Sequence, residues 1–92
     1  MTWYEWDEAK REANLRKHGI DFAGVEAVFE GYTVTMEDER RGYGEQRLVT
    51  FGVLEGRLVA VVHTERHEVI RIISIRRATR SEEKSYLSTI AN

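Results

Sequence analysis

The chain contains 92 residues, of which 41% are hydrophobic and 33% are charged, and its formal net charge is −2. This length and composition predict one folded domain over residues 1–92 and exclude a disordered chain. The chain has no cysteine, which excludes disulfides and thiolate metal sites, and its small negative charge argues against a general nucleic-acid coat protein.

A short strand over residues 2–5 and a helix over residues 8–18 are predicted at the start of the chain. Asp7 is a suitable N-cap for this helix, because its carboxylate can accept hydrogen bonds from main-chain N–H groups of the first turn. Gly19 is suited to end the helix, because glycine readily adopts the left-handed conformation found at helix ends. Both ends of this helix are therefore marked in the sequence.

A second helix is predicted over residues 22–30, where apolar side chains recur at helical spacing. Asp21 can cap its start, and Gly31 follows its end. The pattern then changes to alternation at Tyr32–Met36, which predicts a strand. The charged stretch 37–45 that follows contains two glycines and is predicted to be a loop.

Three β-rich runs separated by short turns come next, over Arg47–Val53, Arg57–Thr64 and Val69–Arg76. The second and third runs are apolar at nearly every position, so we expect them to be central strands. Thr79 and Glu82 form a capping-box pattern before a final helix predicted over residues 80–90. Helices grouped before a run of strands predict an α+β fold with a mostly antiparallel sheet, in the order β-α-α-β-β-β-β-α.

The sequence contains no segment that predicts membrane insertion or export. No apolar run approaches the roughly 20 residues of a membrane-spanning helix. The first seven residues lack the basic start and the apolar middle of a signal peptide. We therefore expect a soluble, cytoplasmic protein that has no membrane partner.

The C-terminal half of the chain is basic, whereas the N-terminal half is acidic. Residues 1–46 contain six Lys or Arg and eleven Asp or Glu, and residues 47–92 contain eight and five. The densest polar and basic group lies at the end of the last predicted strand and in the following helix: Arg71, Ser74, Arg76, Arg77, Arg80 and Lys84.

Strand alternation divides this group between two faces. Ser74 and Arg76 are predicted to continue the apolar row of Ile72, whereas Arg71 and Arg77 are predicted to point to the other face. Arginine donates two parallel hydrogen bonds to phosphate oxygens, so the strand end is a candidate phosphate-binding rim. Alternatively, these arginines pair with the acidic N-terminal half or only solvate the edge of the sheet.

The first predicted helix carries a second candidate surface. Four polar side chains fall within one stripe of this helix, namely Lys10, Asn14, Lys17 and His18. Such a stripe is either solvated surface or, if the helix lies beside the sheet, part of a binding site. His63 and His67 match no metal-ligand spacing, and no phosphate loop or nucleophile elbow is present. We therefore expect no metal ion or cofactor.

Five segments follow one another along nearly the whole chain: Glu5–Lys10, Asn14–Phe22, Arg47–Gly52, Val61–Thr64 and Arg71–Thr79. Together they resemble the BrnT family of ribonuclease toxins from type II toxin–antitoxin systems. Residues 6–19 match the family pattern W-D-x-x-K-x-x-x-N-x-x-K-H-G throughout. One departure is Ile75, at a position where many relatives have alanine, and it leaves Arg76 in register.

The resemblance implies a RelE-like fold and a metal-independent endoribonuclease that inhibits translation. It also implies neutralisation by a BrnA-like antitoxin. The toxin–antitoxin complex would repress its own operon, so this chain would contact DNA only indirectly. A heterotetramer, in which an antitoxin dimer bridges two toxins, is the assembly that the resemblance implies.

Metal-free cleavage of RNA through the ribose 2′-hydroxyl requires charge stabilisation, a proton acceptor and a proton donor. The predicted catalytic residues are His18, Arg47, Ser74, Arg76 and Arg80. The predicted RNA-binding residues are Lys10, Asn14, Lys17 and Arg71. Arginine would stabilise the phosphate, serine would orient it or a water molecule, and histidine, with an ordinary pKa near 6.5, would exchange protons.

The sequence leaves a rival function open. The same basic surface would also suit a non-catalytic interaction domain that binds an antitoxin or another acidic protein. Loss of charge would then weaken protein binding and leave RNA intact.

Overall fold

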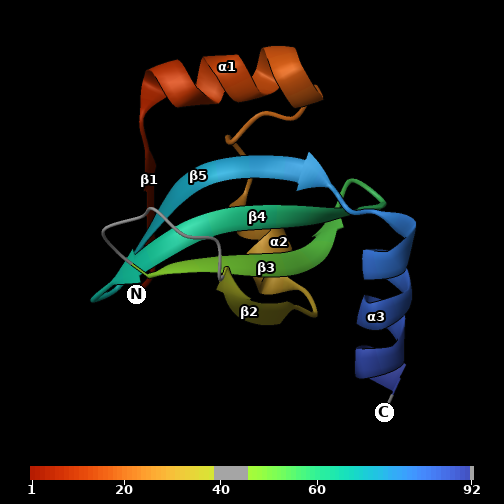
Figure 1. Cartoon of the computed structure of the whole chain (residues 1–92). Coiled ribbons are helices and arrows are strands. Elements are labelled where there is room, and N and C mark those ends of the chain that lie inside the picture. Colours follow the sequence, from red (N-terminus) through yellow and green to blue (C-terminus); the bar gives the residue numbers. More distant parts are fainter. Residues whose placement is uncertain (39–45, 92) are drawn as a thin grey trace.

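The computed structural model describes residues 1–38 and 46–91 (Figure 1). In chain order the described elements are β1 (Trp3–Trp6), α1 (Glu8–His18), α2 (Glu26–Glu30), β2 (Val34–Asp38), β3 (Arg47–Leu54), β4 (Arg57–Arg66), β5 (Val69–Arg77) and α3 (Arg80–Ala91). The predicted α+β class is confirmed. Most of the predicted loop 37–45 lies outside the described residues.

The five described strands form one mixed sheet in the order β1-β5-β4-β3-β2. The three pairs among β2, β3, β4 and β5 are antiparallel, and β4 and β5 are internal strands as predicted. β1 pairs with β5 in parallel, with Trp3 opposite Val69 and Trp6 opposite Ile72. The expectation of a mostly antiparallel sheet therefore missed this pair, because a four-residue strand carries no local signal of its partner's direction.

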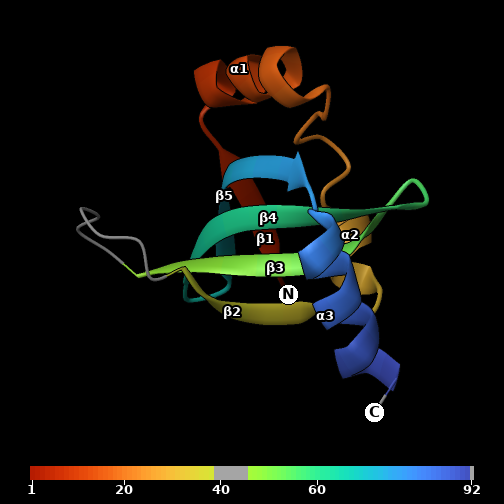
Figure 2. The same ribbon diagram turned by 45° about the vertical axis from the view of Figure 1, so that its right-hand side comes forward.

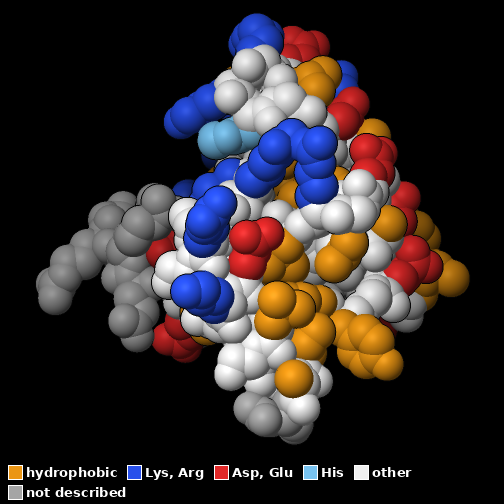
Figure 3. All heavy atoms as spheres, turned by 90° about the vertical axis from the view of Figure 1, so that its right-hand side faces the viewer, with side chains coloured by type: hydrophobic (Ala, Val, Ile, Leu, Met, Phe, Trp, Pro, Cys, Tyr) orange, Lys and Arg blue, Asp and Glu red, His pale blue; other side chains and the backbone are white. Residues whose placement is uncertain are grey.

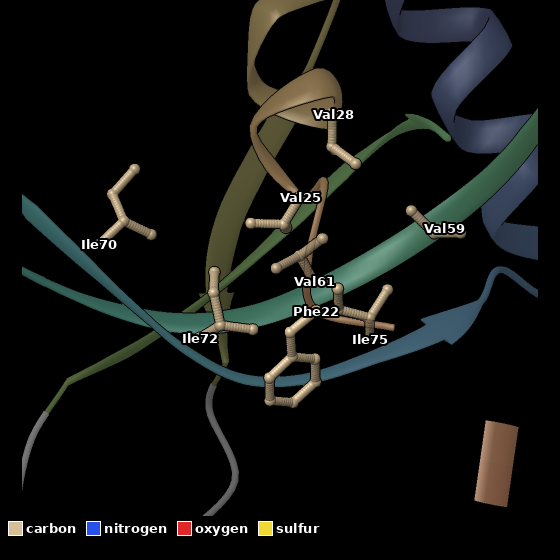
Figure 4. Close-up of a cluster of buried hydrophobic side chains, with 8 residues drawn as sticks. All are labelled: Phe22, Val25, Val28, Val59, Val61, Ile70, Ile72 and Ile75. Atoms are coloured by element: carbon tan, nitrogen blue, oxygen red, sulfur yellow. The ribbon is translucent and has the colours of Figure 1, made fainter. Parts of the chain in front are cut away.

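The two faces of the sheet are covered unequally. α2 and the turn before it cover one face, and α3 contacts one end of the other face. α1 lies beside β5, on the same side of it as the short strand β1 (Figures 1 and 2). The main core lies under α2 and consists of Phe22, Val25, Val28, Val59, Val61, Ile70, Ile72 and Ile75 (Figure 4). The larger part of the buried apolar surface is therefore on the α2 side.

A smaller core anchors α3 to the other face. Tyr86 is the buried residue of α3, and it lies against Phe51 of β3 and Ala60 of β4. The Tyr86 hydroxyl donates a hydrogen bond to the carbonyl oxygen of Tyr32, at 2.7 Å. This single anchor leaves most of the remaining surface of α3 exposed.

The ends of α1 agree with the prediction. The Asp7 carboxylate accepts hydrogen bonds from the N–H groups of Ala9 and Lys10, at 2.8 and 3.2 Å. Gly19 ends the helix with φ of 72°, in the left-handed region that favours glycine. Local capping chemistry is thus sufficient to define this helix.

The second helix is shorter than the predicted range 22–30. The Asp21 carboxylate accepts a hydrogen bond from the Ala23 N–H, at 3.0 Å, but this interaction stabilises a turn. Gly24 has φ of 93°, which a helix cannot accommodate, so regular helix begins at Glu26. The following strand also starts two residues later than predicted, at Val34.

An irregularity in the β4–β5 pair decides which face each side chain of β5 occupies. Val62 lies opposite Ser74, whereas the next residue of β4, His63, lies opposite Ile72. Ile73 is therefore an extra residue in β5, and side-chain alternation changes phase there. The predicted row in which Ser74 and Arg76 continue from Ile72 is wrong for this reason.

Candidate functional site

The bulge at Ile73 gathers predicted site residues on the sheet face opposite α2. Ser74 and Arg76 are paired with Val62 and Ala60, and Arg71 is paired with Thr64. Ala60 belongs to the small core under α3, so Ser74 and Arg76 lie on the sheet face that α3 contacts. Arg47 lies on the same face, because side chains alternate along β3 and Arg47 is in the row of Val49 and Phe51. We name this surface, with its residues Arg47, Arg71, Ser74 and Arg76, the basic face.

Arg77 does not share a face with Arg71, contrary to the prediction from simple alternation. Arg77 lies opposite Val59, which belongs to the core on the α2 side. Its side chain lines a hollow there together with Arg57. Two consecutive arginines, Arg76 and Arg77, therefore lie on opposite faces at the end of β5.

Arg76 makes a two-pronged ion pair with Glu82 in the first turn of α3. Its two terminal nitrogens donate to the two carboxylate oxygens, at 2.8 and 2.9 Å. These hydrogen bonds are the main reason that the pKa of Glu82 falls to about 2, from an ordinary value of 4.5. The guanidinium of Arg76 is thus held in a defined orientation at the end of the sheet.

Glu82 also caps the helix that carries it. The Thr79 N–H donates to the Glu82 carboxylate at 2.8 Å, and the Glu82 N–H donates to the Thr79 hydroxyl at 3.2 Å. The predicted capping box is confirmed. Its second role, the contact with Arg76, could not be read from the sequence, although the spacing had already singled out Glu82.

Acidic partners also lie beside the other two arginines of the basic face. Arg71 donates to the Glu5 carboxylate at 2.8 Å, across the parallel β1–β5 pair. Both side chains are about half exposed, so this pair contributes little to stability. Arg47 lies opposite Asp38 in the β2–β3 ladder. Pairing with the acidic N-terminal half, one of the two alternatives raised by the sequence, therefore applies to Arg71.

Asn14 is a structural residue, although the sequence suggested that it contacts RNA. Its side chain is buried, and its amide oxygen accepts from the Ile75 N–H at 3.1 Å. Its amide nitrogen donates to the carbonyl oxygens of Ile75 and Ile20, at 2.9 and 3.0 Å. β1 pairs with β5 only as far as Ile72. Beyond that point Asn14 supplies hydrogen-bond partners to the main-chain N–H and carbonyl groups of Ile75, and it thereby attaches α1 to β5.

This attachment sets the direction of the neighbouring side chains of α1. Lys10 and Lys17 precede and follow Asn14 by four and three residues, so both lie on one side of its contact with β5. Arg11 lies on the opposite side, where it pairs with Asp21 at 3.1 Å, next to the α2 layer. Lys10 and Lys17 are exposed, and they therefore lie on the same side of the sheet as the basic face.

The two remaining predicted residues lie at the ends of helices. His18 is half-buried as the last residue of α1. Arg80 is the first residue of α3, and its side chain lines a pocket between α3 and the β3–β4 hairpin. Figure 3 shows Lys and Arg side chains, with a histidine among them, gathered from α1 at the top to the middle of the molecule.

The described residues contain no group of three or more His, Asp or Glu side chains arranged to hold a metal ion. His63 is buried under α2, where its Nε2 atom lies 2.7 Å from the Thr50 hydroxyl oxygen and its ring contacts Phe29 edge to face. Within residues 1–38 and 46–91, no helix has the length and apolar character needed to cross a membrane.

A family model described as the ribonuclease toxin BrnT of type II toxin–antitoxin systems matches residues 6–82. The chain belongs to the BrnT family. The matched range begins in β1 and ends at Glu82, so it contains the basic face and the acidic partner of Arg76. No curated protein matches the chain. Membership of this family makes the chain a ribonuclease toxin and implies a partner antitoxin.

Proposed function

We propose that this BrnT-family toxin is a metal-independent endoribonuclease that binds RNA along the basic face and inhibits translation by cutting RNA. One observation carries the proposal: the bulge at Ile73 brings Arg71, Ser74 and Arg76 to one face, together with Arg47 of β3. Exposed Lys10 and Lys17 extend the cationic surface onto α1. Such a surface suits a polyanion whose phosphates are spaced along a strand.

In the proposed reaction, the 2′-hydroxyl oxygen of a ribose attacks the adjacent phosphorus atom, and the bond from phosphorus to the 5′ oxygen breaks. The 2′-hydroxyl proton passes to a base, and a second proton passes to the departing 5′ oxygen. The products are a 2′,3′-cyclic phosphate end and a 5′-hydroxyl end. No metal ion is required in this scheme.

Arg76 is proposed to stabilise the negative charge that develops on the phosphate oxygens. A guanidinium carries five N–H donors, so it can contact Glu82 and a phosphate at once. Ser74, two residues earlier on the same face, would orient the phosphate, and Arg47 would add charge from β3. His18 is the proposed acid–base group, because histidine commonly acts as both general acid and general base in catalysis, and Arg80 would contact RNA near the start of α3.

The partners follow from the family. We propose that a BrnA-like antitoxin neutralises this chain and that an antitoxin dimer bridges two toxins in a heterotetramer. Repression of the operon would belong to that complex, with the DNA contacts supplied by the antitoxin. Light scattering of the co-purified complex is expected to give two copies of each chain.

The test is cleavage of purified RNA in EDTA by the wild type and by Arg76→Ala. Removal of one transition-state donor is expected to slow cleavage about 100- to 1,000-fold, and mass spectrometry of the wild-type products is expected to show cyclic phosphate ends. Arg16→Ala, at an exposed position of α1, is the matched control and is expected to cleave normally. Arg76→Lys keeps the charge without the planar fork and should be intermediate.

Circular dichroism establishes that each variant is folded. Cleavage by folded Arg76→Ala at the wild-type rate would remove Arg76 from the mechanism. Dependence of wild-type cleavage on a divalent ion would refute the metal-free scheme.

The alternative, a non-catalytic interaction domain, is favoured by one observation: Arg71 and Arg76 are both engaged by carboxylates within the chain. Its signature would be antitoxin binding by a wild-type protein that cuts neither free RNA nor RNA on ribosomes. Cleavage in either setting excludes this alternative.

A further inference from the structure

Outside the basic face, the structure contains an apolar groove between α3 and the β3–β4 hairpin. Val53 and Leu58 of the hairpin and Tyr86 and Leu87 of α3 line it, and its volume is about 460 Å³. This volume falls within the range of roughly 300 to 1,000 Å³ that is usual for ligand-binding clefts. We name it the α3 groove.

Several large apolar side chains in and near the α3 groove are exposed. Val53, Leu87 and Ile90 are 48%, 59% and 43% exposed. Helical spacing explains this exposure, because Tyr86 occupies the side of α3 that meets the sheet. Leu87 and Ile90, one and four residues later, lie to one side of that contact. Contiguous exposed apolar surface of this kind marks a contact site for another molecule.

The rim of the α3 groove is charged. Arg80 and Lys84, four residues apart on α3, both line it, together with Glu83. Figure 3 shows hydrophobic side chains gathered below a group of Lys and Arg side chains on this side of the molecule. A complementary partner therefore presents apolar side chains to the floor of the groove and carboxylates to its two cationic rim residues.

We propose that the α3 groove is the docking site for an amphipathic, acidic segment of the partner antitoxin. The proposal rests on the proposed function for the existence of a neutralising protein partner, and it adds the surface and the chemistry of the contact. The segment would place apolar side chains against Leu87 and Val53 and acidic side chains beside Arg80 and Lys84.

Charge argues against a second copy of this chain as the occupant. A twofold contact through the α3 groove would be made by the same patch on both copies. Two copies together would bring four cationic rim residues into the contact but only two rim carboxylates, those of Glu83, and such an excess of like charge across an interface is unfavourable. The carboxylates of an acidic partner would instead attract Arg80 and Lys84.

The position of the α3 groove also explains how its occupation would inhibit the toxin. Arg80 on the rim and Glu82, which holds Arg76, lie in the same first turn of α3. A segment bound along α3 would therefore end beside the basic face. RNA and antitoxin would compete for the space around the end of β5.

The experiment is isothermal titration calorimetry, in which a purified BrnA-like antitoxin is titrated into the wild type and into the variants Leu87→Asp and Lys84→Glu. Leu87→Asp buries a charge in the proposed contact and is expected to weaken binding at least tenfold. Lys84→Glu is expected to weaken it about three- to tenfold, mainly through slower association. Leu15→Asp makes the same change on α1, where Leu15 is 41% exposed, and should bind normally.

Each variant is also assayed for RNA cleavage without antitoxin. Leu87→Asp is expected to cut RNA at the wild-type rate and to require more antitoxin for inhibition. If the wild type cuts no RNA but Leu87→Asp still weakens antitoxin binding, the proposed ribonuclease mechanism fails and the docking site stands.

Two results would overturn the docking site. One is antitoxin affinity that Leu87→Asp and Lys84→Glu leave unchanged. The other is a dimer of the isolated chain, detected by light scattering, that Leu87→Asp converts to a monomer, because the α3 groove would then be a contact between copies.

Discussion

At the scale of single residues, polar groups inside the sheet are joined in a short chain. The hydroxyl oxygens of Thr35 and Thr50 lie 2.7 Å apart, and Thr50 also contacts His63 Nε2 at 2.7 Å. His63 is 1% exposed, and its Nδ1 atom has no hydrogen-bond partner among the described residues. Burial lowers the pKa of His63 to about 4, from 6.5, so this imidazole is neutral in the folded protein.

His63 therefore predicts a loss of stability in mild acid. Unfolded His63 takes up a proton below pH 6.5, whereas folded His63 does so only near pH 4, so the free energy of unfolding falls as pH decreases through this window. From pH 6.5 to 5 the expected loss is about 1.6 kcal/mol. Urea denaturation across this range tests it, with His63→Leu expected to flatten the slope. An equal slope in that variant would contradict the assignment.

The ion pair between Glu82 and Arg76 affects stability at a lower pH than His63 does, because the ordinary pKa of Glu82 is 4.5. Its pKa in the folded protein is depressed to about 2. The stability that it contributes is therefore complete above pH 4.5 and is lost as pH falls toward 2. The window from pH 6.5 to 5 consequently separates the effect of His63 from that of Glu82.

At the scale of elements, α2 lies unusually close to β3. Gly52 of β3 faces α2, and a Cβ atom at this position would lie 2.7 Å from the Val28 Cγ1 atom and 3.2 Å from the Val28 carbonyl oxygen. Glycine is therefore required here by the approach of the helix, and not by its backbone conformation. This contact holds α2 against β3, beside the main core, whose strand residues belong to β4 and β5.

Gly52→Ala is expected to destabilise the protein by about 1 to 3 kcal/mol, because α2 must move to accommodate the added methyl group. Urea denaturation measures the change. Gly31→Ala is the control: its nearest contact would be the Val28 carbonyl oxygen at 3.8 Å, and the expected change is within about 0.5 kcal/mol. Wild-type stability of Gly52→Ala would show that α2 does not approach β3 so closely.

At the scale of the whole molecule, the net charge of −2 conceals a division of charge over the surface. The basic face and its extension on α1 lie on one side of the molecule, and α2, with acidic Glu26 and Glu30, covers the other. This division is compatible with RNA binding by an acidic protein, because affinity depends on the charges near the phosphates.

RNA binding is therefore expected to depend on salt in proportion to the phosphates contacted. For single strands, each contact contributes about −0.7 to the slope of log affinity against log salt concentration. Lys17→Ala should make the slope shallower by about 0.7, and Arg16→Ala should leave it unchanged. Fluorescence anisotropy with 2′-O-methyl RNA, which lacks the attacking hydroxyl, measures the slope without cleavage. An unchanged slope for Lys17→Ala would exclude its contact with RNA.

The sequence by itself determined the elements whose ends depend on local chemistry. Asp7 and Gly19 mark α1, and Thr79 with Glu82 marks the start of α3, because capping bonds form between residues a few positions apart. The start of the second helix is not marked in this way, because apolar periodicity continues through Gly24 and does not reveal its positive φ. The resemblance to the BrnT family also rests on short segments of the sequence, and one of them, Arg71–Thr79, contains Arg76.

Only the tertiary structure decided the direction of β1, the phase of β5 and the partners of the site residues. A bulge arises from the pairing of two strands and has no signature in either alone, so the insertion of Ile73 could not be read from alternation. The same dependence on distant atoms applies to Asn14, which fastens α1 to β5, and to Arg76, which meets Glu82 only because α3 turns back at the end of the sheet. These interactions join residues through space, whereas periodicity and capping report only on neighbours in the chain.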